Sequence, residues 1–148
     1  MSRRKIALVC VALAAIPLAN IVTACAASPR TERPAYLDRS LQRPTQKGAF
    51  TVRIESRDSP VPLHRIHRWS VTVADPQGHP VSGATIRVDG GMPEHGHGLP
   101  TAPSVQPATP PGSYVIIGMK FSMDGWWELK LDIEAGGVTD RVTFNLVL

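Results

Sequence analysis

The chain has 148 residues, of which 43% are hydrophobic and 5% aromatic, and it carries 16 lysines and arginines against 12 acidic residues. Three of the basic residues lie at positions 3 to 5, so the rest of the chain is nearly neutral, with 13 basic and 12 acidic residues. This balance gives no support for a nucleic-acid partner. The 2 cysteines are Cys10 and Cys25, so a domain that follows them must be stable without a disulfide.

The first 24 residues have the pattern of an export signal, with a basic start followed by an apolar run over 6–22. Residues 22–25, Val-Thr-Ala-Cys, match a bacterial lipobox. We therefore predict a lipoprotein signal peptide over 1–24, cleavage before Cys25 and lipid attachment to that cysteine. The alternative is that the segment stays as a membrane anchor, because 6–24 is nearly long enough to span a bilayer. Either way we expect a lipid-anchored or membrane-anchored protein of the bacterial cell envelope, facing the periplasm or the exterior.

The next segment is polar, contains Pro29, Pro34 and Pro44, and has no sustained period of two or 3.6. We predict a flexible membrane tether over 25–48, followed by a single domain over 49–148. A short ordered segment within 36–41 is the alternative.

From Ala49 onward the pattern indicates strands. Apolar and polar residues alternate over 50–54, 67–73 and 84–88, and Trp69 is placed in the core. Over 113–121 the alternation puts Val115, Ile117, Met119 and Phe121 on one face. Residues 93–111 are rich in proline and are expected to form a long loop.

The last third predicts a β-hairpin around the two-residue turn at Gly136 and Gly137. The register follows from the alternation on the two arms, because every facing pair must lie on one side of the sheet. The predicted pairs are Leu131 with Val142, Leu129 with Phe144, Trp127 with Leu146, and Asp132 with Arg141.

Six or seven short strands and no amphipathic helix predict an all-β fold. The architecture that fits best is an antiparallel immunoglobulin-like β-sandwich of about seven strands. A small barrel is the alternative.

Residues 90–100 contain the side chains most typical of a functional site. Met92, His95 and His97 lie within six positions on a backbone rich in glycine and proline. Imidazole suits copper and zinc, and a thioether favours Cu(I), so we predict a copper site formed by these three residues. Met123, at the end of another strand, is a candidate fourth ligand, and so is Met119. The alternative is that the two histidines only hold the loop against the sandwich through hydrogen bonds.

The other histidines and Met119 have simpler interpretations. Met119 alternates with core residues and is expected to pack in the core. His64 and His67 flank the start of a strand and are expected to have structural roles. His79 lies in a surface turn and is expected to be solvated.

An ordered series of motifs resembles the YtkA-like domain family, with FixH-like proteins as a looser relation. The motifs are Met-Pro-Glu-His-Gly-His-Gly at 92–98, Gly-Ser-Tyr at 112–114, Met-Lys-Phe-Ser-Met at 119–123 and Gly-Trp-Trp at 125–127. The resemblance covers about 65–148. It implies one immunoglobulin-like sandwich at the bacterial envelope, and roles in copper handling or oxidase assembly.

Two functions remain as hypotheses. In the first, the protein is a tethered binding module that captures or delivers copper. In the second, it is a structural or interaction lipoprotein that offers a surface to an envelope protein partner. An enzyme is not expected, because there is no Gly-x-Ser-x-Gly elbow, no nucleophilic thiol and no phosphate-binding glycine loop.

Overall fold

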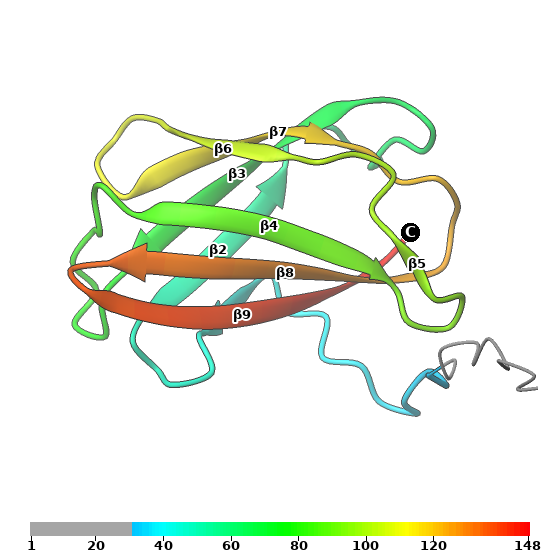
Figure 1. Cartoon of the computed structure of the whole chain (residues 1–148), viewed down its shortest axis with the longest axis horizontal. Helices are drawn as coiled ribbons and strands as arrows, with labels where there is room; N and C mark the ends of the chain where they lie inside the picture. Colours follow the sequence, from blue (N-terminus) through cyan, green and yellow to red (C-terminus); the bar gives the residue numbers. More distant parts are fainter. Residues whose placement is uncertain (1–30) are drawn as a thin grey trace, which may run out of the picture.

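A computed structural model describes residues 31–148, and these form two antiparallel β-sheets that face one another (Figure 1). One sheet has the strand order β1-β2-β3-β7-β6 and the other has the order β5-β4-β8-β9. The all-β sandwich is therefore confirmed. The strands are β1 Gln42–Pro44, β2 Thr51–Ser56, β3 His67–Ala74, β4 Thr85–Met92, β5 His97–Gly98, β6 Ser104–Pro107, β7 Ser113–Met119, β8 Trp126–Ala135 and β9 Val138–Val147.

The nine strands exceed the expected seven because three short strands have too few residues to show a period in the sequence. Strands β5 and β6 lie inside 93–111, which we predicted as loop. Strand β1 lies inside the predicted tether, 25–48, and pairs with β2. The domain thus begins before Ala49.

The core fills the space between the sheets. It is formed by the inward residues of β2, β3, β4, β7, β8 and β9, and Val52, Trp127 and Phe144 are fully buried. Trp69 is 2% exposed, as predicted. Alternation with a period of two places these side chains on one face of each strand, which is why the core could be foreseen from the sequence.

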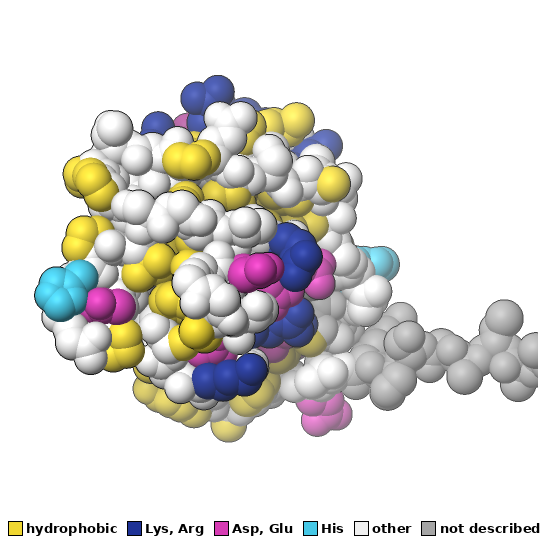
Figure 2. All heavy atoms as spheres, turned by 60° about the vertical axis from the view of Figure 1, so that its left-hand side comes forward, with side chains coloured by type: hydrophobic (Ala, Val, Ile, Leu, Met, Phe, Trp, Pro, Cys, Tyr) yellow, Lys and Arg dark blue, Asp and Glu magenta, His cyan; other side chains and the backbone are white. Residues whose placement is uncertain are grey.

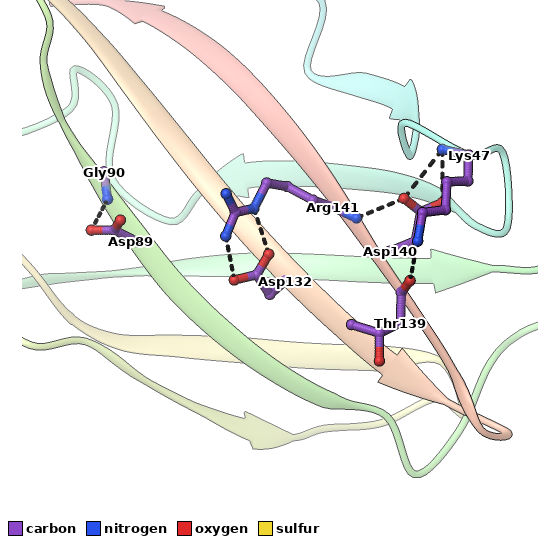
Figure 3. A network of polar contacts seen from close by, with 7 residues as sticks. All are labelled: Lys47, Asp89, Gly90, Asp132, Thr139, Asp140 and Arg141. Atoms are coloured by element: carbon purple, nitrogen blue, oxygen red, sulfur yellow. Dashed lines mark hydrogen bonds and ion pairs between the residues drawn. The ribbon is translucent and has the colours of Figure 1, made fainter.

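The C-terminal hairpin has the predicted register. Leu129 pairs with Phe144, and Asp132 pairs with Arg141. On the outer face the Arg141 guanidinium donates from an Nη atom to a carboxylate oxygen of Asp132 at 2.8 Å (Figure 3). The Gly-Gly turn and the alternation of both arms agree, so the register is confirmed.

The predicted face of β7 is wrong over its first half. Tyr114 and Ile116 point into the core, whereas Val115 and Ile117 do not. The cause is a bulge, because Arg68 pairs with Ile117 but His67 pairs with Met119. The extra residue is Gly118, whose φ of 88° suits only glycine well. The bulge shifts the alternation by one residue, so Met119 and Phe121 are buried as expected.

Charges on the outside of the molecule are mixed in sign. Figure 2 shows acidic and basic side chains beside one another on the face that it draws, with apolar side chains scattered among them. The ion pairs include Lys130 with Glu128 at 3.0 Å and Arg43 with Asp38 at 3.3 Å.

Within residues 31–148 no helix is long and apolar enough to cross a membrane. The predicted signal peptide over 1–24 and the lipidation site at Cys25 lie outside the described residues.

Candidate metal site

The predicted site lies at one end of the sandwich, on the hairpin that joins β4 to β5. Met92 and His97 are directly opposite one another on these two strands. The carbonyl of Met92 accepts hydrogen bonds from the backbone N–H groups of His95 at 3.1 Å and Gly96 at 2.8 Å. These bonds close a tight turn that presents His95 and His97 to solvent.

Glycine at position 91 is required for this hairpin to close. A Cβ there would lie 2.3 Å from the carbonyl oxygen of His97, which no side chain could tolerate. The close approach of the two backbones brings the His97 position directly beside Met92. The local sequence thus determines that the first and last predicted ligands of the loop are neighbours across the strands.

The two histidine side chains form an exposed pair. Their rings are nearly parallel, with an angle of 8° between the planes and 6.1 Å between the centroids. The ring nitrogens that form hydrogen bonds within residues 31–148 belong to His67 and His79, not to His95 or His97. Two free imidazoles on one short hairpin can turn toward a shared ion at little conformational cost.

Met92 differs from the histidines because its side chain is buried. It is 1% exposed and belongs to the hydrophobic core. Its terminal Cε lies so close to Gly125 that a Cβ on that glycine would be 2.8 Å away. The thioether thus packs beside the predicted site but inside the protein, and it would have to move outward to contact an ion shared with the histidines.

Met123 lies on the turn that faces this hairpin. The turn joins β7 to β8, and its Gly125 is the residue that Met92 contacts. Met123 is 36% exposed, and its carbonyl accepts a hydrogen bond from the indole N–H of Trp127 at 3.1 Å. The structure therefore brings the Met123 turn and the 92–97 hairpin to the same end of the sandwich (Figure 1).

The hard donors near the hairpin do not complete a metal site. Among residues 31–148 there is no group of three or more His, Cys, Asp or Glu side chains arranged to hold a metal ion. Glu94 is directed to Arg33, with 3.6 Å between a carboxylate oxygen and Nε. A metal here would therefore depend on the two imidazoles and on thioethers, which is a donor set for a soft ion.

A polar hollow of about 400 Å³ lies beside His97 on the outer side of the hairpin. The residues that line it include Gly90, Gly91, Asp89, Glu128 and Lys130. The Lys130 ammonium is 3.0 Å from the Glu128 carboxylate, so the charges in the hollow are already partly compensated.

The segment that borders the hairpin has no signal in the sequence. The N–H of Thr31 donates to the carbonyl of Pro93 at 3.1 Å, and Arg33 pairs with Glu94. Nothing in the polar, proline-containing sequence of 31–41 signals these contacts, because it has no periodicity. Trp126 was also left unassigned, and it is buried at 2% exposure on the outer face, with its indole N–H on the Oδ1 of Asn145 at 3.0 Å.

Met119, His67 and His79 have surroundings of their own within residues 31–148. Met119 is fully buried in the core, as expected. His67 is also buried, at 5% exposure, among the rings of Trp69 and Phe121, and its Nε2 has no hydrogen-bond partner. His79 pairs with Asp75 at 2.9 Å in the turn after β3.

Comparison with known proteins gives a family but no assigned activity. A comparison with curated proteins finds no significant match. A solved structure titled "ZirS C-terminal Domain" aligns with 90% of this chain and 93% of its own, at 15% identity and a TM-score of 0.39. The profile of the YtkA-like family matches residues 45–132, which is more than half of the chain. The match spans the sandwich from the end of β1 into β8 and includes the whole 92–97 hairpin. The chain therefore belongs to the YtkA-like family.

Proposed function

We propose that the protein is a binding module that captures or delivers copper, as Cu(I), at the end of the sandwich formed by the 92–97 hairpin. The observation that carries the proposal is the exposed, parallel pair of His95 and His97, whose ring nitrogens form no hydrogen bond within residues 31–148. Met123 lies on the facing turn, and Met92 is directly across from His97. Two imidazoles with nearby thioethers favour Cu(I) over harder ions.

The proposed location is the cell envelope, with the domain tethered to a membrane through lipid on Cys25. The lipobox at 22–25 and the absence of thiols from the folded part support this location. Replacing Cys25 with serine should move the protein from the membrane fraction to the soluble fraction. An unchanged distribution, with the N-terminal segment still attached, would show that the segment acts as an uncleaved anchor instead.

A competition titration with a chromophoric Cu(I) chelator tests the metal site. The double variant His95→Ala/His97→Ala should bind Cu(I) at least about tenfold more weakly than the wild type, which corresponds to about 1.4 kcal/mol. His79→Ala is the matched control, since it removes an exposed histidine from another turn. Equal affinity in the double variant and the wild type would overturn the proposal.

The role of Met92 needs a variant that preserves the core. Alanine at this buried position would leave a cavity and destabilise the fold by about 2–5 kcal/mol. Met92→Leu keeps most of the volume and removes only the sulfur. A loss of Cu(I) affinity in this variant, with unchanged thermal stability, identifies Met92 as a ligand.

A second candidate function is a structural or interaction lipoprotein whose hairpin only completes the fold. The burial of Met92 and the contacts of Thr31 and Arg33 with the hairpin favour it. It predicts that His95→Ala/His97→Ala lowers the melting temperature of the metal-free protein. Unchanged metal-free stability would remove this alternative, because both side chains would then contribute nothing to the fold.

A further inference from the structure

His64 has an unusual backbone conformation. Among residues 31–148, His64 is the only residue other than glycine whose backbone is left-handed, with a φ of 61°. Its side chain is exposed and its N–H donates to the carbonyl of Phe121 at 2.8 Å. Left-handed residues with side chains are uncommon and are found disproportionately at functional sites.

The turn that His64 contacts is held on two sides. On one side, His64 and the bridge between Leu63 and Phe121 fix its start. On the other side, the Cε of Met92 packs against Gly125, near its end. Met123 lies between these two contacts, with its carbonyl held by Trp127. Met123, which is 36% exposed, thus lies on a turn that contacts both the His64 loop and the 92–97 hairpin.

We propose that His64 is a further ligand for Cu(I), acting with Met123 of the turn that joins β7 to β8. The backbone of His64 is hydrogen-bonded to Phe121, and Phe121 is two residues from Met123 along the chain. Each step between successive Cα atoms is about 3.8 Å, so the Cα atoms of His64 and Met123 lie in the same small region of the molecule. An imidazole and a thioether are a donor pair suited to a soft monovalent ion. The neighbouring cation, Arg65, forms an ion pair with Asp58, with 3.7 Å between an Nη atom and a carboxylate oxygen.

This inference rests on the proposed function and extends it. The end of the sandwich would carry two neighbouring groups of donors, His95 with His97 and His64 with Met123. Because Met123 lies on the turn between the His64 loop and the hairpin, an ion could pass from one group to the other over a short path.

The competing explanation is that His64 is present only because a histidine tolerates the left-handed region. The two explanations differ for glycine, which adopts this conformation without strain. If His64 is only structural, His64→Gly should preserve every property of the protein. If it is a ligand, the same variant should fold as well as the wild type or better and yet lose affinity for the ion.

The experiment uses the full-length protein purified in detergent. Thermal unfolding of the metal-free protein and chelator competition for Cu(I) are measured for wild type, His64→Gly and the control His79→Ala. We expect His64→Gly to have an equal or higher melting temperature and about tenfold weaker Cu(I) affinity, while His79→Ala binds as the wild type does. We also expect the ring nitrogen resonances of His64 to shift when Ag(I), a stable substitute for Cu(I), is added to the wild type.

Each other outcome overturns the inference and separates it from the proposed function. If the wild type binds Cu(I) and His64→Gly binds within twofold of it, His64 is not a ligand, and the function proposed for the hairpin stands. If the His64 nitrogen resonances do not shift with Ag(I) while those of His95 and His97 do, the inference fails regardless of the stability of the variant. If the wild type binds neither ion, both proposals fail.

Discussion

Asp140 shows how one side chain joins the N-terminal strand to the C-terminal hairpin. The residue is 4% exposed, and its carboxylate accepts a hydrogen bond from the N–H group of Lys47 at 3.0 Å (Figure 3). It also accepts one from the N–H group of Ala49 at 3.2 Å. Burial opposes ionisation, but the bonds from Thr45, Arg141, Ala49 and Lys47 outweigh it and hold the pKa of Asp140 below its ordinary value. The charged carboxylate therefore holds the 45–49 turn against β9.

Replacing Asp140 with asparagine should destabilise the protein by about 1–3 kcal/mol at neutral pH, because a charged acceptor of several N–H groups is lost. The folded-state pKa lies below the unfolded one, so this stabilisation is present above about pH 4 and is lost as pH falls through the folded-state pKa. Urea unfolding from pH 7 to pH 2 should show a shallower acid-side loss of stability in Asp140→Asn than in the wild type. Parallel profiles would contradict this role. Asp124→Asn, in the turn of Met123, is the control, since Asp124 is exposed.

At the scale of an element, the segment 31–41 crosses the outer face of the sheet that contains β8 and β9. It contacts the 92–97 hairpin at Pro93 and strand β9 at Asn145, whose side-chain N–H donates to the carbonyl of Asp38 at 2.9 Å. The same Asn145 accepts the indole N–H of Trp126. Trp126 faces outward, on the side of β8 opposite Trp127, and is nevertheless buried. We infer that the segment 31–41 covers Trp126 and is part of the domain.

Replacing Asn145 with alanine should loosen this cover. The indole N–H of Trp126 and the carbonyl of Asp38 both lose their partner, at a cost of about 1–2 kcal/mol. The expected result is greater quenching of tryptophan fluorescence by acrylamide, with little change in the melting transition of the core. Thr143→Ala, two residues away on the same face of β9, is the matched control and should leave quenching unchanged. Quenching that is equal in wild type and Asn145→Ala would show that the segment does not depend on this contact.

The elements that could be predicted are those whose position and register are specified by the local sequence pattern. The β8–β9 hairpin was foreseen to the residue because the turn and both arms specify the same register. The face of β7 could not be, because the bulge at Gly118 depends on its pairing with β3, far away in the chain. Strand β1 and the segment 31–41 owe their positions to contacts with β2 and β9, and no periodicity marks them. Tertiary contacts determine these elements, and a single sequence does not display such contacts.

At the scale of the whole molecule, the candidate site also combines features set by local sequence with features set by tertiary contacts. Residues 92–97 stand out in the sequence because glycine and two histidines at this spacing are a local signal, but the β4–β5 hairpin that carries them was not predicted, since 93–111 was expected to be loop. That Met92 is buried could not be foreseen, because it depends on Gly125 of the facing turn. The sequence predicts only a structural role for His64, because its contact with the turn that carries Met123 joins residues far apart in the chain.

The extent of the domain gives the last prediction. A chain that begins at Ala49 contains the core strands of both sheets but lacks β1, the buried Thr45, and Lys47, one partner of Asp140. It also lacks the segment over Trp126. We expect such a chain to be less stable than one that begins at residue 31 by at least about 2 kcal/mol, which lowers the melting temperature by roughly 10 °C in a domain of this size. Its tryptophan emission should also be red-shifted, because an indole on the outer face of β8 becomes exposed to water.

Equal melting temperatures and equal emission would show that 31–48 is only a tether, as its composition suggests. The expected difference would instead show that residues 31–48 are part of the fold and contact the histidine hairpin through Thr31 and Arg33. Metal affinity should then be measured on the longer chain, since the shorter one lacks the contacts that position the hairpin.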